Sequence, residues 1–86
     1  MPEICRFYGI VITMYYNEHN PPHFHALYGD FRAEIDIRTL KILNGNLPNR
    51  AKSLIKEWAE EHNNELMDDW NLARQKEELK VIEPLK

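Results

Sequence analysis

Short, mainly apolar runs occupy the N-terminal half of the chain. These runs are rich in β-branched and aromatic residues and are separated by Gly, Asn, Asp and Pro, a pattern typical of β-strands joined by turns. The runs are residues 4–8, 10–16, 23–28, 31–37 and, as a shorter fifth candidate, 40–43. Residues 1–44 are therefore predicted to form an antiparallel β-meander of about four to five strands.

The dipeptide Gly29-Asp30 predicts a two-residue hairpin turn in the middle of this meander. With that turn, Tyr28 pairs with Phe31, and the pairing continues along both strands to His23 opposite Asp36. One face of the hairpin then holds Phe24, Ala26, Tyr28, Phe31, Ala33 and Ile35, and the other holds His23, His25, Arg32, Glu34 and Asp36. A register slip of one residue would mix these sets, so we expect the apolar face to point inward and the titratable face outward.

The C-terminal half of the chain changes to helical periodicity. Pro48 suits the first turn of a helix, and the pattern predicts one helix over residues 48–75 that bends or breaks near Asn63-Asn64. Its apolar stripe holds Ala51, Leu54, Ile55, Trp58, Ala59, His62, Leu66 and Ala73. The tail, residues 79–86, is expected to lie against a sheet edge. The prediction is a single α+β domain, residues 1–86, in which a long C-terminal helix packs on one face of the antiparallel meander.

Composition and charge narrow the class of protein. Of the 86 residues, 43% are hydrophobic and 29% are charged, which suits one small folded domain and argues against disorder of the whole chain. The net charge of −3 excludes the overall basic character that drives nonspecific binding to nucleic acid. The single cysteine, Cys5, excludes an intrachain disulfide and is expected to be buried. Because the chain lacks a signal-peptide pattern and an apolar run of about 20 residues, we expect a cytoplasmic protein that does not bind membranes.

Three of the four histidines lie within seven residues, around Pro21-Pro22. His23 and His25 project from the same side of an extended strand and face Asp36 and Glu34 in the predicted hairpin. A histidine beside a carboxylate can transfer protons in catalysis. Imidazoles and carboxylates can also bind a divalent transition metal such as zinc. The candidate metal ligands are His19, His23, His25, Glu34 and Asp36. A third interpretation is polar cross-strand pairing on a solvated sheet face, worth about 0.2–1 kcal/mol per pair.

Arg32, Trp70 and His62 are further candidates for functional or structural roles. Arg32 shares the histidine face and can hold a phosphate bidentately, although a salt bridge to Glu34 or Asp36 is an alternative use. Trp70 is expected to be a packing anchor, although its place at the edge of the helical stripe would mark a partner surface if it were half exposed. His62 lies within the stripe and is expected to be a core or boundary histidine with a local hydrogen bond.

The segment NEHNPPHFH, residues 17–25, is the most specific motif of the chain. Further motifs are RFYGIVI at 6–12, YGD at 28–30, AEID at 33–36, LP at 47–48, EWA at 57–59, WNLAR at 70–74 and IEPL at 82–85. Together they resemble the bacterial family catalogued as domain of unknown function 4160, over essentially the whole chain. The resemblance marks His19, Pro21, Pro22, His23 and His25. It implies a small stand-alone protein that is often encoded beside a second small protein, in an arrangement similar to a toxin–antitoxin pair.

The leading hypothesis is a protein of such a toxin–antitoxin-like module that acts through its histidine-bearing sheet face. If the chain is the toxin, His23 and His25 would act as base and acid in RNA cleavage. Arg32 would stabilise the phosphorane and Glu34 would complete the catalytic set, with His19 and Asp36 as further binding residues.

Two other hypotheses come from different classes of protein. The chain could be a non-enzymatic module that binds a small protein encoded by a neighbouring gene, through Trp70 and the outer helix face, and an exposed edge strand could also support a homodimer. Alternatively, it could be a metal-binding domain. The sequence does not decide whether this protein is an enzyme.

Overall fold

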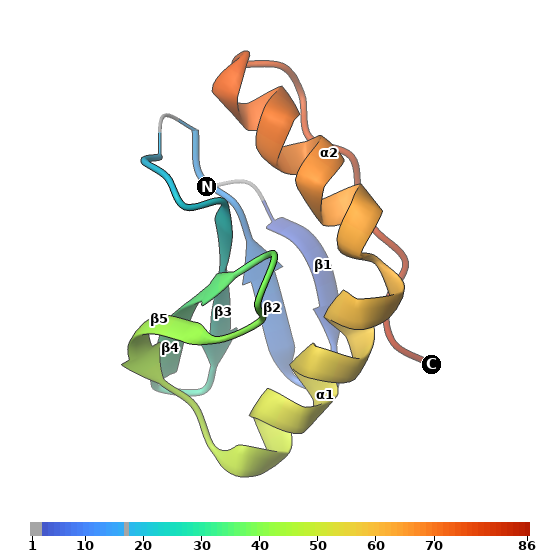
Figure 1. Cartoon of the computed structure of the whole chain (residues 1–86). Helices are drawn as coiled ribbons and strands as arrows, with labels where there is room; N and C mark the ends of the chain where they lie inside the picture. Colours follow the sequence, from blue (N-terminus) through green and yellow to red (C-terminus); the bar gives the residue numbers. More distant parts are fainter. Residues whose placement is uncertain (1–2, 17) are drawn as a thin grey trace.

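The first half of the chain forms a five-stranded antiparallel sheet (Figure 1). The computed structural model describes residues 3–16 and 18–86. The strands are β1 (Glu3–Phe7), β2 (Ile10–Thr13), β3 (His23–Tyr28), β4 (Phe31–Asp36) and β5 (Ile42–Asn46). They lie side by side in chain order. The predicted α+β fold with an antiparallel meander is therefore confirmed.

The hairpin of β3 and β4 has the predicted register at all six pairs. Tyr28 pairs with Phe31, His25 pairs with Glu34, and the ladder ends at His23 opposite Asp36. Gly29, in the turn, has a φ of +57°, a left-handed conformation that glycine adopts without steric cost. The fourth strand, predicted to end at residue 37, ends at Asp36.

Two strands differ from their predicted bounds by two residues or more at one end or at both. β2 stops at Thr13 instead of residue 16, although the next residue, Met14, is still fully buried. β5 begins at Ile42 instead of residue 40, because the chain first closes a turn. In that turn the backbone N–H of Leu40 donates to the carbonyl oxygen of Asp36 (2.8 Å), and Leu40 adopts a φ of +61°.

Two helices follow one another along one side of the sheet (Figure 1). They are α1 (Asn49–Glu61) and α2 (Asn63–Arg74). The chain breaks between them at His62, with φ −115° and ψ 24°, next to the predicted position of the break. The buried helical residues are Ala51, Ile55, Trp58, Ala59, Leu66, Asp69, Trp70 and Ala73. Trp58 packs against the rings of Phe7 and Phe24 on the sheet, with centroid distances of 5.3 and 6.0 Å.

The C-terminal tail lies along the β1 edge of the sheet, as predicted. The backbone N–H of Ile82 donates to the carbonyl oxygen of Ile4 (2.8 Å), and the indole N–H of Trp58 donates to the carbonyl oxygen of Glu83 (2.8 Å). Ile82 is buried, whereas its neighbour Val81 is exposed. The tail thus covers one edge of the sheet, and β5 forms the other.

The burial and hydrogen bonds of Cys5, His62 and Trp70 can be compared with their predicted environments. Cys5 is buried as expected, and burial raises the pKa of its thiol. His62 is partly buried and makes a local hydrogen bond, from Nδ1 to Glu65 Oε1 (2.6 Å). Trp70 is only 2% exposed, which agrees with its expected role as a packing anchor and does not meet the condition for a partner surface at this residue.

The prediction that the titratable hairpin face points outward was wrong at one end of the hairpin. His23 is 5% exposed and Asp36 is 9% exposed. The reason is that α2 reaches this end of the sheet, where the ring of Trp70 lies 5.3 Å from the ring of His23. Further along the same face, His25 and Glu34 are partly exposed and Arg32 is exposed.

No helix among the described residues is long and apolar enough to span a lipid bilayer.

Candidate metal centre

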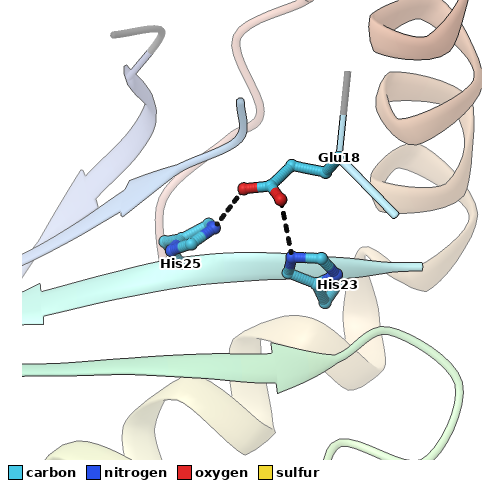
Figure 2. Close-up of side chains that lie close together, drawn as sticks. All are labelled: Glu18, His23 and His25. Carbon is cyan, nitrogen blue, oxygen red and sulfur yellow. Dashed lines mark hydrogen bonds and ion pairs between the residues drawn. The ribbon is translucent and has the colours of Figure 1, made fainter. Parts of the chain in front are cut away.

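The carboxylate of Glu18 lies between the imidazole rings of His23 and His25 (Figure 2). Its Oε1 is 3.1 Å from His25 Nε2, and its Oε2 is 3.8 Å from His23 Nε2. The two histidines are neighbours on one face of β3, and their ring centroids are 5.3 Å apart. Glu18 comes from the loop that precedes β3 and folds back over that strand. Three side chains from eight residues of chain therefore converge on one point.

The orientation of the His23 ring is set by a backbone carbonyl. His23 Nδ1 lies 2.8 Å from the carbonyl oxygen of Pro21, which can only accept, so Nδ1 must donate a hydrogen. Nε2 then faces Oε1 of Glu34 at 3.4 Å and Oε2 of Glu18 at 3.8 Å. This nitrogen is buried and has no hydrogen-bond partner among the described residues. Two carboxylate oxygens that face a buried nitrogen create a negative local potential, which favours a bound cation at this point.

His25 stands in a more open environment than His23. Its side chain is 21% exposed, compared with 6% for His23. The rings of Tyr15 and His25 form a T-shaped pair with a centroid distance of 4.4 Å and an interplanar angle of 86°. His25 can therefore contact a small molecule that enters from solvent.

A pocket of about 350 Å³ opens beside these residues on the same sheet face. Its polar lining includes Tyr15, Glu18, His25, Arg32, Glu34 and Asn44. The side-chain amide of Asn44 on β5 donates to Glu34 Oε2 (3.2 Å), which holds that carboxylate in place. The pocket thus combines a guanidinium, two carboxylates and an imidazole within reach of one small ligand.

The spacing of Glu18, His23 and His25 suits a divalent transition metal. Their candidate ligand atoms all lie within 4.8 Å of one another. A tetrahedral ion with bonds of about 2.0–2.1 Å separates its ligand atoms by about 3.3 Å. The distances from Glu18 are of similar size, 3.1 Å from Oε1 to His25 Nε2 and 3.8 Å from Oε2 to His23 Nε2. The Nδ1–carbonyl hydrogen bond of His23 is the outer-shell contact that commonly orients a ligating imidazole. Two imidazoles and one carboxylate leave coordination positions open for water or substrate.

The structure brings some of the predicted site residues together and places others elsewhere. His23, His25 and Glu34 come together, and Arg32 lines the adjoining pocket. His19 is exposed and lies outside the group of mutually close ligand atoms. Trp70 packs on His23 from α2 and is buried, so it lines the back of the site and does not face solvent.

Asp36 pairs with His23 in the strand register, but its carboxylate is used elsewhere. Oδ1 accepts hydrogen bonds from the backbone N–H groups of Arg38 (2.7 Å) and Thr39 (3.0 Å). This is the turn that an aspartate closes with its own side chain. The predicted use of Asp36 as a metal ligand is therefore not supported, because backbone donors already occupy this carboxylate oxygen.

The sequence-based prediction missed Glu18. It lies in the NEHNPPHFH motif, seven residues before His25, but strand alternation places only residues that are themselves in strands. A carboxylate beside three histidines was the available signal. Its contact with both rings depends on the path of the loop over β3, and no periodicity in the sequence describes that path.

Comparison with known families agrees with the motifs of the chain. The model of the family described as Domain of unknown function (DUF4160) matches residues 9–71. This chain belongs to that family. The match includes Glu18, His23 and His25, together with strands β2 to β5, helix α1 and most of helix α2. No curated protein and no solved structure matches the chain at a significant level.

Proposed function

We propose that this member of the DUF4160 family binds a divalent transition metal ion through Glu18, His23 and His25. The supporting observation is the environment of His23 Nε2, a buried nitrogen without a hydrogen bond that faces two carboxylates. The Nδ1 contact with Pro21 leaves Nε2 as the nitrogen that is available for a metal. An ion bound there balances the carboxylates and satisfies the buried nitrogen at the same time.

The pocket beside the three ligands indicates a role in chemistry on an anionic substrate. Glu18 and His25 line this pocket, so an ion that these residues held would be accessible from it. Arg32 lines it too and is exposed, and a guanidinium can hold a phosphate oxygen bidentately. A bound divalent ion acts as a Lewis acid and activates water. We propose hydrolysis of a phosphodiester, with RNA as the substrate of a cytoplasmic toxin in a toxin–antitoxin-like module.

A metal-independent acid–base cleavage of RNA by His23 and His25 stays a prediction. The surroundings of the two rings differ, because His25 lines the pocket and His23 does not. In that mechanism His25 would contact the substrate, and His23 would act through the Glu18 carboxylate. A cleavage assay in the presence of chelator distinguishes the two mechanisms.

The test of the metal site is isothermal titration calorimetry, in which chelator-treated protein is titrated with zinc chloride. We expect one ion per chain and a rise in the melting temperature. Glu18→Gln and His25→Ala should each weaken binding by at least about 100-fold, since loss of an outer-shell contact alone costs 10–100-fold. Both side chains are partly exposed, so these variants should fold.

The matched control is His19→Ala, an exposed histidine of the same loop. We expect its zinc affinity to equal that of the parent chain. No saturable binding by the parent chain, or an equal loss in His19→Ala and His25→Ala, would contradict the proposal.

A second candidate function, binding of a small protein partner, is favoured by a groove between the sheet and α1. The groove has a volume of about 300 Å³. Ile35, Ile42 and Ile55 line it, together with Lys41, Lys52 and Lys56. An apolar floor with a lysine rim is complementary to an acidic amphipathic helix.

Co-purification with the product of the neighbouring gene should be lost in the Lys41→Gln, Lys52→Gln, Lys56→Gln triple variant and kept in His25→Ala. A homodimer through the β5 edge stays a prediction.

A further inference from the structure

A second polar pocket lies where the loop before β3, the turn after β4 and helix α2 meet. Its volume is about 520 Å³. The polar side chains that line it are Asn20, Arg38, Asn71 and Arg74, and Met67 and Trp70 supply apolar lining. These residues come from three segments that are far apart in the sequence. The pocket is therefore a product of the tertiary fold.

The charge of this pocket is unbalanced. Within residues 3–16 and 18–86, no carboxylate lines it, although the chain has 14 Asp and Glu residues and a net charge of −3. Neither Arg38 nor Arg74 forms an ion pair with any residue that the structure describes. Arg38 and Arg74 are both exposed, and an anion in the pocket would lie near two positive charges with no competing carboxylate among the described lining residues. The expected ligand is therefore an anion.

The wall of the pocket is structured and partly buried. Trp70 is 2% exposed, and its indole N–H has no hydrogen-bond partner among the described residues. Pro21, which also lines the pocket, is held by the contact of its carbonyl oxygen with His23 Nδ1. Packing and a partly buried hydrogen bond thus hold this wall in place, which lowers the entropic cost of binding.

We propose that the pocket of Arg38 and Arg74 binds a phosphate group. A guanidinium presents its donors in a planar fork that matches phosphate oxygens, and the side-chain amides of Asn20 and Asn71 can each add a donor. The phosphate could belong to a free phosphate or phosphomonoester, or to the backbone of a nucleic acid. The proposal does not depend on a metal at Glu18, His23 and His25, because none of these residues lines the pocket.

The test is a two-dimensional ¹H–¹⁵N NMR titration of metal-free protein with inorganic phosphate and, separately, with a single-stranded RNA dodecamer. We expect saturable shifts of the Trp70 indole N–H and of the Arg38 and Arg74 side chains. The double variant Arg38→Gln, Arg74→Gln should weaken binding by at least tenfold. The control is Arg50→Gln, which changes an exposed arginine of α1 outside the pocket, and we expect its affinity to be unchanged.

The two ligands distinguish the sources of the phosphate. RNA that binds more tightly than inorganic phosphate, with both lost in the double variant, supports a nucleic-acid backbone. Phosphate binding without RNA binding supports a free phosphate or phosphomonoester. No saturable binding of either ligand overturns the proposal, and so does an equal loss of affinity in Arg50→Gln. Because zinc is absent, failure here leaves the metal proposal to its own test.

Discussion

The loop before β3 contributes to two pockets of opposite chemistry. On one side, Glu18 faces His23 and His25 and lines a pocket with a second carboxylate, Glu34. On the other side, Asn20 and Pro21 line the pocket of Arg38 and Arg74. The net charge of −3 describes neither pocket. The sign of the charge that a site attracts is set by the few groups around it and by their burial, because both determine the local electrostatic potential.

The two pockets differ also in how their charged groups are satisfied. In the histidine site, carboxylates face imidazole nitrogens at 3.1 to 3.8 Å, so the protein itself supplies partial compensation. The arginine pocket has no carboxylate among its described lining residues. Pro21 connects the two, because its carbonyl oxygen accepts the His23 hydrogen bond while the residue also lines the arginine pocket.

Of the substitutions that test the difference between the two pockets, His23→Ala is expected to have the largest effect. His23 is 5% exposed, packs on Trp70 and holds the Pro21 carbonyl, so its removal leaves a cavity and an unsatisfied carbonyl. We expect a loss of about 2–3 kcal/mol in the free energy of unfolding, measured by urea denaturation in the presence of chelator. The same change at the more open His25 should cost less than about 1 kcal/mol. Equal losses at both positions would show that the two histidines are not in different environments.

A smaller effect is expected from Glu34→Gln. Its Oε1 is 3.4 Å from His23 Nε2, but Glu34 is outside the group of three mutually close ligands. We therefore expect zinc affinity to fall about tenfold, within the range for an outer-shell residue, as measured by calorimetry. A loss as large as that of Glu18→Gln would place Glu34 among the direct ligands. Gln is nearly isosteric with Glu and keeps an oxygen that can accept the hydrogen bond of the Asn44 amide.

The smallest effect is expected from Asp69→Asn, which tests a buried carboxylate outside both pockets. Asp69 Oδ1 accepts the backbone N–H of Lys80 (2.9 Å). Burial raises the pKa of its carboxyl, against the lowering effect of that hydrogen bond. The folded state thus holds this proton to a higher pH than the unfolded state does. Between the two pKa values, ionisation of the unfolded chain lowers the stability of the fold as the pH rises.

The measurement for Asp69 is the urea midpoint of both proteins from pH 3 to pH 7. The stability of Asp69→Asn relative to the parent chain should increase as the pH rises above about 4, the ordinary value for an aspartate, and then level off. Subtraction of the two curves removes the contributions of the other carboxylates. A difference that is constant with pH, or that decreases, would show that burial does not raise this pKa.

Much of the fold could be predicted from local patterns. The two-residue turn at Gly29-Asp30 and the alternation of the flanking strands were sufficient for all six pairs of the β3–β4 hairpin. Helical periodicity predicted most of the buried stripe and the break next to Asn63. Strand ends were less predictable. Leu40, for example, belongs to a turn that Asp36 closes, and an apolar run alone does not distinguish a turn from a strand.

The candidate site could be predicted only in part. Strand alternation placed His23 and His25 on one face and Glu34 opposite His25, as the structure has them. It could not show that Glu18 returns over the strand or that Trp70 buries His23. Nor did it show that Asp36, although opposite His23, would turn its carboxylate to the backbone of Arg38 and Thr39.

The sequence by itself determined the family, the meander, the register of the central hairpin and the presence of histidines on one of its faces. These features depend on contacts between residues that are close in the chain or related by a two-residue period, and such contacts leave a pattern in the sequence. The tertiary structure alone decided the burial of His23, the position of Glu18 and the meeting of Arg38 with Arg74 in one pocket. Each of these depends on the path of a loop or on the docking of α2. Both are determined by contacts between residues that are far apart in the sequence.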